Sequence, residues 1–182
     1  MSESVSDITI IGSGMVGLSI AYQLINRLPD LKISIIEKES NIGKHSSGRN
    51  SGVLHAGIYY PPKSLKAKIC VSGAKRLKEW CESENLPILK CGKIITPQSI
   101  ELDQQLEVLL QRGRANGANI SFICEKDFKL KVPFGRTASG RALWTPDTCV
   151  VKPLIILERL REKLSEKGVN FVFNANQIVF NH

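Results

Sequence analysis

The stretch Asp7–Gly17, DITIIGSGMVG, decides the fold. A short β-branched run that ends at Ile11 predicts a buried strand. The pattern G-x-G-x-x-G follows it at once. In this context Gly12 allows a tight turn, Gly14 lets a pyrophosphate approach the backbone, and Gly17 lets a helix pack closely on the strand. The stretch therefore predicts a strand–turn–helix unit that binds a diphosphate at a helix N-terminus.

An acidic residue completes this pattern. Glu37 stands twenty positions after Gly17, at the end of a second predicted strand over residues 32–37. Its carboxylate can accept hydrogen bonds from the hydroxyls of an adenosine ribose and would repel a 2′-phosphate. The sequence thus predicts a dinucleotide site that disfavours NADP, while the fingerprint alone leaves NAD and FAD open.

The segment 41–57 favours FAD. It is polar and carries four glycines among Ser and Asn, where an NAD domain would continue with a second βα unit. Such a loop can present several backbone N–H groups to the ribityl chain of an extended FAD, and Arg49 can help to neutralise the diphosphate. The residues expected to bind FAD are Gly12, Ser13, Gly14, Met15, Val16, Gly17, Glu37, Lys38, His45, Ser46, Ser47, Arg49, Asn50, Ser51 and Gly52.

The rest of the chain alternates helical and strand patterns, as expected of an α/β protein. Periodicity and breakers predict helices over 16–28, 64–84, 99–115 and 152–167. They predict strands over 88–96, with a turn near residues 91–92, and over 119–124, 169–173 and 177–180. Ser64 is the expected N-cap of the second helix, and Leu65, Ile69, Leu77 and Trp80 are spaced for one face of it. Residues 126–141 are rich in Pro and Gly, which predicts irregular structure.

Composition narrows the classes of function. The 182 residues are 42% hydrophobic, which is enough for a sizeable core. The net charge of +8 suits anionic ligands, but the basic residues are scattered and form no nucleic-acid recognition module, so we expect no nucleic-acid partner. The five cysteines form no C-x-x-C pair, so we expect no metal site.

Cysteine usage and hydropathy also bear on location. Free thiols fit a reducing compartment, and we expect a cytoplasmic protein. No apolar run approaches the length that spans a bilayer. Peripheral contact with the inner face of a membrane stays open.

Three segments resemble a known family. They are HSSGRNSGVLHAGIYY at 45–60, SLKAKIC at 64–70 and CGK at 91–93. Together they are similar to the L-2-hydroxyglutarate oxidases and dehydrogenases, a branch of the D-amino-acid-oxidase-like flavoproteins. The resemblance implies an α/β fold with a Rossmann-like FAD-binding domain at 1–90, the start of a mixed α+β substrate domain at 91–150, and a helix and strands at 151–182 that return toward the FAD domain. It also implies truncation, as a fragment, a gene remnant or one part of a split enzyme, because full-length members continue well past residue 182.

The resemblance implies oxidation of a 2-hydroxy acid, L-2-hydroxyglutarate to 2-oxoglutarate, by hydride transfer to flavin. His55 is the candidate base or substrate-orienting residue, since an ordinary pKa of about 6.5 suits that task; the alternative is a structural histidine. Tyr59, Tyr60 and Lys66 are candidate substrate contacts or else packing residues. His45 is expected to contact the cofactor, with covalent attachment of the flavin as the alternative.

Two other functions stay open. One is an amine or amino-acid oxidase of the same superfamily, and the other is a non-catalytic FAD-binding fragment. The electron acceptor is open as well, because oxygen, a quinone and a carrier protein are all compatible with the sequence.

Overall fold

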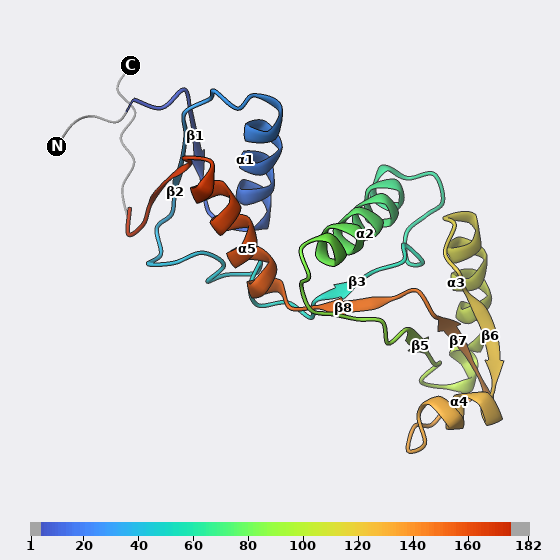
Figure 1. Cartoon of the computed structure of the whole chain (residues 1–182). Coiled ribbons are helices and arrows are strands. Elements are labelled where there is room, and N and C mark those ends of the chain that lie inside the picture. The colour runs from blue at the N-terminus through green and yellow to red at the C-terminus, as the bar shows by residue number, and fades with distance from the viewer. Residues whose placement is uncertain (1–4, 176–182) are drawn as a thin grey trace. The chain divides into compact units, whose positions relative to one another are not determined.

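The computed structural model describes residues 5–175, which form two compact units. Unit 1 combines Met1–Ser51 with Lys152–His182, and unit 2 is the segment Gly52–Val151 between them (Figure 1). Residues 52–90, which the sequence analysis places with the FAD-binding domain, are thus grouped in the structure with residues 91–151.

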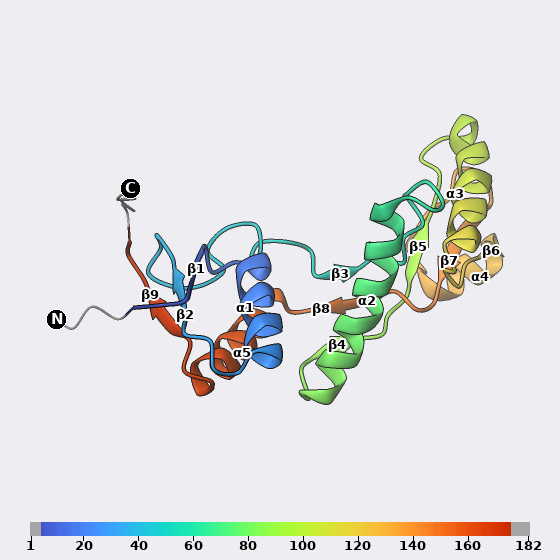
Figure 2. The same cartoon turned by 90° about the horizontal axis from the view of Figure 1, so that it is seen from above.

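Unit 1 is a parallel sheet with two helices (Figures 1 and 2). Its strands lie in the order β1-β2-β9 and all pair in parallel. The connection from β1 through α1 to β2 is a βαβ unit, and α5 leads into β9, which gives the 3-2-1 half of a Rossmann sheet. The bounds are β1 (Ile8–Ile11), α1 (Met15–Arg27), β2 (Ile33–Ile36), α5 (Pro153–Glu166) and β9 (Asn170–Val172). These elements confirm the predicted ones; the strand expected at 177–180 lies outside the described residues.

The core of unit 1 follows from residue spacing. Helix α1 buries Leu18, Ala21 and Ile25, which recur at the three- and four-residue intervals of one helix face. Helix α5 buries an equivalent stripe and packs against α1. The central strand β2 has buried residues at three consecutive positions, as a parallel strand covered on both faces requires. The α5 stripe consists of Ile156, Leu157, Leu160 and Leu164.

Unit 2 is a mixed α+β unit. One antiparallel sheet has the order β3-β8-β4 and the other the order β5-β7-β6. The bounds are β3 (Val53–Leu54), α2 (Leu65–Ser83), β4 (Ile88–Leu89), β5 (Lys93–Ile95), a 3-10 turn (Ile100–Leu102), α3 (Asp103–Ala115), β6 (Ser121–Cys124), α4 (Glu125–Lys131), β7 (Arg141–Thr145) and β8 (Cys149–Val151). The α/β fold class is confirmed, and unit 2 has the mixed α+β architecture that the sequence predicted.

One local prediction for unit 2 was confirmed in part and another was wrong. The strand expected over 88–96, with a turn near Gly92, is two strands in different sheets, and the expected turn divides them. Gly92 has φ +68, and a Cβ there would lie 2.0 Å from the Trp144 ring. The segment expected to be irregular begins with α4, whose first turn is acidic and whose last turn is basic, a charge order that favours a helix. Buried Phe128 holds α4 in place.

The predicted N-cap of helix α2 is confirmed, but the face that carries its large apolar residues is not its buried face. The Ser64 Oγ accepts a hydrogen bond from the Ala67 N–H at 3.2 Å, as an N-cap should. Leu65 is 72% and Ile69 is 60% exposed, whereas Ala67 and Cys81 are buried. The buried face of α2 therefore carries small side chains, which a search for large apolar residues overlooks.

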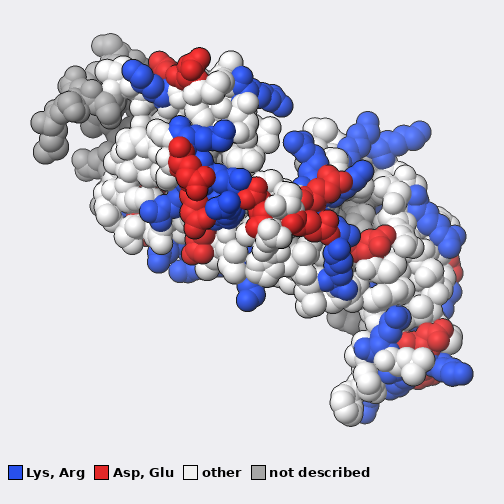
Figure 3. Space-filling model, in the orientation of Figure 1, with Lys and Arg blue, Asp and Glu red and all other residues white. Residues whose placement is uncertain are grey.

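The surface of the described chain shows mixed charge. On the face shown in Figure 3, Lys and Arg side chains are interleaved with Asp and Glu. Within residues 5–175, no helix combines the length and the apolar character needed to cross a bilayer.

The loop that follows β2 is locked by two glycines. Gly43 has φ +65 and packs against α5, where a Cβ would lie 2.6 Å from Leu157 Cδ1. A Cβ on Gly48 would lie 2.1 Å from the Gly43 carbonyl oxygen. The backbone thus folds onto itself and onto α5 at one point, and neither glycine leaves room for a side chain.

We expect Gly48→Ala to destabilise unit 1, because the new methyl group must displace backbone. The free energy of unfolding should fall by roughly 1–3 kcal/mol, measured by urea denaturation followed by circular dichroism. Gly73→Ala is the control: this helical glycine has nothing within 4 Å of an added Cβ, so the substitution should stabilise by roughly 0.5–1 kcal/mol. Equal midpoints for Gly48→Ala and the wild type would contradict the close packing.

Candidate functional site

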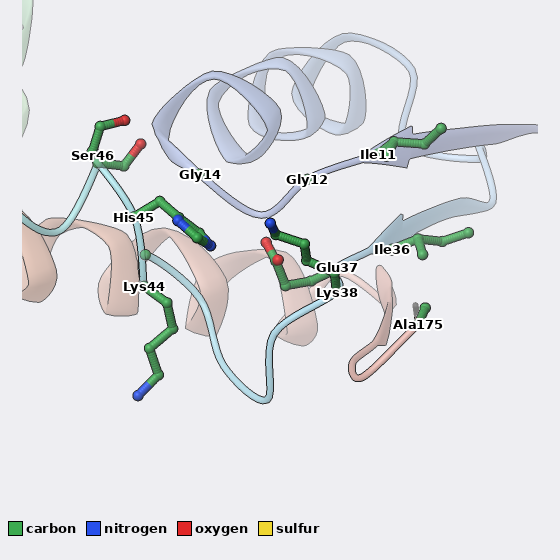
Figure 4. A pocket seen from close by; sticks show the side chains of 12 residues that line it. Ile11, Gly12, Gly14, Ile36, Glu37, Lys38, Lys44, His45, Ser46 and Ala175 are labelled. Carbon is green, nitrogen blue, oxygen red and sulfur yellow. The ribbon is translucent and has the colours of Figure 1, made fainter. Parts of the chain in front are cut away.

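A cleft of about 520 Å³ lies at the carboxyl ends of β1 and β2 in unit 1 (Figure 4). Its size falls in the range of small-molecule sites. Residues predicted to bind the cofactor line it from the first turn, from the end of β2 and from the following loop. The lining residues are Ile11, Gly12, Gly14, Ile36, Glu37, Lys38, Gly43, Lys44, His45, Ser46, Ser47 and Ala175.

The turn from β1 into α1 is shaped by close backbone contact. Gly12 has φ +98, and its N–H donates to the Ile36 carbonyl at 2.7 Å. A Cβ on Gly17 would lie 2.0 Å from the Gly12 oxygen, so only glycine fits there. The first turn of α1 carries no acidic residue, and the first N–H groups of a helix lack acceptors within it. The positive end of α1 is therefore available to an anion.

Ser47 lies directly over this helix end. Its Oγ accepts a hydrogen bond from the Met15 N–H at 3.0 Å, and a Cβ on Gly14 would lie 2.9 Å from the same oxygen. Asn50 Nδ2 donates to the Ser47 carbonyl at 2.9 Å, which fixes the loop around the serine. The Met15 N–H is thus already paired with an oxygen acceptor, which shows that this end of α1 accommodates oxygen ligands, as binding of a diphosphate requires.

The carboxylate of Glu37 organises the other side of the cleft. Oε2 accepts from the Ser13 N–H at 2.9 Å and from the Ser13 hydroxyl at 2.7 Å, while Oε1 accepts from the Glu39 N–H at 3.1 Å. Burial raises the pKa of Glu37, but these donors favour the charged form and hold its pKa below the ordinary value. The carboxylate also lines the cleft, where it can accept a hydrogen bond from a ribose hydroxyl.

Lys38, Lys44 and His45 also line the cleft. The His45 Nε2 lies 2.8 Å from Glu39 Oε1. In Figure 4 the Glu37 side chain points toward the Gly12–Gly14 turn, whereas Lys44 extends away from it.

Several predicted cofactor residues lie elsewhere. Ser13 is buried beneath Glu37, and Val16 is 73% exposed on α1. Arg49, Asn50 and Ser51 are exposed and do not line the cleft, and Gly52 belongs to unit 2. Gly43 and Lys44 were missed, although Gly43 belongs to the glycine-rich segment that the sequence singled out.

A second polar cluster lies in unit 2. The Lys93 Nζ donates to the Tyr59 hydroxyl at 2.7 Å and lies 4.6 Å from the centre of the Tyr59 ring. The His55 ring meets the same tyrosine edge to face, with centroids 6.3 Å apart. The predicted residues His55 and Tyr59 are thus together, and Lys93 joins them. The sequence signal for Lys93 was its place in the CGK segment.

The loop that carries His55 and Tyr59 is braced from two helices. Asn116 Nδ2 donates to the carbonyls of Gly57 at 2.9 Å and Tyr60 at 3.0 Å. The Cys70 thiol lies 3.4 Å from the His55 carbonyl oxygen. The other two predicted contacts form a separate pair, in which the Lys66 Nζ lies 4.8 Å from the centre of the Tyr60 ring.

His55 is set up to be neutral. Burial, with the positive charge of Lys93 as the second cause, lowers its pKa below the ordinary histidine value. A neutral imidazole can accept a proton, which a base requires. His55 also lines a second cleft, of about 300 Å³, together with the charged residues Lys75, Lys78 and Asp147.

Comparison with known proteins supplies the family. The family model described as FAD dependent oxidoreductase, DAO, matches residues 7–180. The chain belongs to the DAO family of FAD-dependent oxidoreductases. FAD is therefore the cofactor, as the sequence predicted.

Curated members of this DAO family resemble the chain along most of its length. The L-2-hydroxyglutarate dehydrogenases of Dictyostelium discoideum and Homo sapiens, both described as mitochondrial, are 36% and 44% identical and match 99% and 95% of the chain. A bacterial L-2-hydroxyglutarate dehydrogenase from Indibacter alkaliphilus is 37% identical over 94% of it. The chain spans 42%, 37% and 43% of these three relatives.

Solved structures of DAO-type oxidoreductases share the fold. The FAD-bound L-alpha-glycerophosphate oxidase of Mycoplasma pneumoniae superimposes with a TM-score of 0.81 at 27% identity, over 93% of this chain and 44% of that one. Glycine oxidase from Geobacillus kaustophilus gives a TM-score of 0.78 at 18% identity, over 93% of this chain and 46% of that one. The second likeness bears on the fold alone.

The buried carboxylate predicts a pH-dependent contribution to stability. Because the folded-state pKa of Glu37 is depressed, its stabilisation is present above the ordinary glutamate pKa of about 4.3 and is lost as pH falls through the folded value. Glu37→Gln should lower the free energy of unfolding by roughly 1–3 kcal/mol near neutral pH, and the difference from the wild type should narrow in acid. Urea denaturation across this pH range measures it.

Glu166→Gln, at an exposed carboxylate that ends α5, is the control and should change stability by less than about 0.5 kcal/mol. A Glu37→Gln effect that stays the same from neutral to acid pH would contradict the charged state assigned to Glu37.

Proposed function

We propose that this chain supplies the FAD-binding part and part of the substrate site of an enzyme that oxidises a 2-hydroxy acid, most specifically L-2-hydroxyglutarate to 2-oxoglutarate. One observation carries the substrate class: relatives that are 36–44% identical over 95–99% of the chain are L-2-hydroxyglutarate dehydrogenases. The geometry supports it, because a neutral histidine lies beside a lysine–tyrosine pair in unit 2.

The binding step rests on unit 1. The N–H groups at the start of α1 receive the diphosphate, with Ser47 Oγ as its neighbour, and Glu37 accepts a ribose hydroxyl. Gly43 and Gly48 hold the loop in a shape that leaves this surface open. The remaining residues predicted to bind the cofactor, in the segment 49–52, stay a proposal for the part of FAD beyond the diphosphate.

The chemical step rests on unit 2. Bound FAD supplies the acceptor for the hydride that leaves C2 of the substrate. His55 accepts the hydroxyl proton at a ring nitrogen, for which its lowered pKa keeps it ready at neutral pH. Tyr59, Tyr60 and Lys66 offer hydrogen bonds and positive charge to the substrate. We propose a cytoplasmic setting, which the five free cysteines favour, and an acceptor among oxygen, a quinone and a carrier protein.

The first test uses adenosine fragments. Because Glu37 is charged and buried beside the diphosphate site, ADP should compete with FAD for the chain, while an ADP carrying a 2′-phosphate should compete at least about tenfold less well. Glu37→Gln should weaken the binding of FAD and reduce the difference in affinity between the two ADP fragments. The surface variant Glu166→Gln should change neither quantity. Quenching of flavin fluorescence measures both affinities, and equal competition by the two fragments would exclude the proposed role of Glu37.

The second test separates three functions. Protein loaded with FAD is mixed with substrate without oxygen, and the absorbance of oxidised flavin is followed. Bleaching by L-2-hydroxyglutarate is the expected outcome, and His55→Asn should slow it by roughly a hundredfold or more. Bleaching by glycine or sarcosine instead would identify an amine oxidase. Bound FAD that neither class reduces would identify a non-catalytic FAD-binding chain.

A further inference from the structure

The lysine–tyrosine pair of unit 2 has hydrogen-bond donors to spare. Lys93 gives one N–H to the Tyr59 oxygen at 2.7 Å, and an ammonium has three. Since lysine accepts no hydrogen bond, the phenolic hydrogen of Tyr59 must point to another acceptor. The pair therefore presents a positive charge and up to three donors at a tyrosine that is 39% exposed.

The backbone on both sides of the pair is held firmly. Lys93 opens β5 opposite Thr145, whose buried hydroxyl donates to the Lys93 carbonyl at 3.2 Å. Gly92, just before it, allows no side chain because of Trp144. Tyr59 lies in the loop that Asn116 braces. Donors held in place by the fold bind a matching acceptor at a lower entropic cost.

We propose that Lys93 and Tyr59 together bind one carboxylate of a dicarboxylate substrate beside His55, which makes Lys93 a specificity-determining residue. The inference rests on the proposed function and deepens it. A carboxylate is planar, charged and accepts about four hydrogen bonds, which matches a cation with several donors. A monocarboxylic hydroxy acid, which needs its only carboxylate at the reacting end, would leave this pair without a ligand.

The pKa of His55 should report on binding of a carboxylate, because charged groups surround this histidine. Lys93 lowers the pKa of His55, and Lys75, Lys78 and Asp147 line the cleft that His55 also lines. A carboxylate bound at Lys93 would offset that positive charge and raise the pKa of His55. Removal of the Lys93 charge should also raise this pKa, but burial should still keep it below the ordinary value.

The test measures binding of glutarate, which cannot be oxidised at C2, to the FAD-loaded chain, with butyrate as the monocarboxylate. The imidazole signal of His55 is followed by NMR across pH and assigned with His55→Asn. We expect glutarate to bind at least about tenfold more tightly than butyrate and to raise the pKa of His55. Lys93→Met and Tyr59→Phe should each lower the affinity for glutarate at least about threefold, and Lys93→Arg should restore part of the lost affinity.

Lys126→Met, which removes an exposed charge from α4 of the same unit, is the matched control and should leave glutarate affinity unchanged. Circular dichroism checks that each variant is folded. Unchanged glutarate affinity in Lys93→Met, or a loss confined to Lys75→Met or Lys78→Met, would overturn the proposal. Failure of L-2-hydroxyglutarate to reduce the flavin, with glutarate still bound through Lys93, would remove the proposed function alone.

Discussion

The hydrogen bonds received by the Glu37 carboxylate are the constraint on which the cofactor cleft depends. They join the turn after β1, through Ser13, to the end of β2, and they also hold the backbone of Glu39 in the loop that follows. A buried charge is costly unless donors surround it, so the Gly12–Gly14 turn and the loop cannot move apart without exposing that charge or leaving it unpaired. The cleft is thereby formed before any ligand arrives.

The return of the chain after unit 2 completes this arrangement. Helix α5 packs on α1 and presents Leu154 and Leu157 to the two glycines of the loop. The loop in turn places Ser47 against the Met15 N–H. Helix α5, which comes after unit 2 in the sequence, thus fixes the position of Ser47 at the start of α1. This contact explains why an insertion as large as unit 2 leaves unit 1 a single folded unit.

The sequence predicted unit 1 well because its signals are local. A β-branched run predicts a strand, a glycine motif predicts the turn into a helix, and an acid at a set spacing marks the end of the next strand. The corresponding elements appear where they were expected. Unit 2 depends on contacts between distant residues. Nothing near Gly92 shows that Trp144 will cover it, and nothing near Lys93 shows that Tyr59, 34 residues earlier, will accept its hydrogen bond. The exposed Leu65 and Ile69 show the same limit, since periodicity cannot say which face of α2 is covered.

The same contrast separates the two halves of the proposed chemistry. Binding a diphosphate needs backbone N–H groups, which a short motif can supply by itself. Choosing a substrate needs side chains from separate strands and loops, and in unit 2 those come from the loop after β3 and from β5. Tyr59 contacts both His55 and Lys93, so it links the proposed proton acceptor to the proposed carboxylate-binding residue. In the proposed function, substrate choice and proton transfer therefore share one side chain, and we expect a change at Tyr59 to act on both.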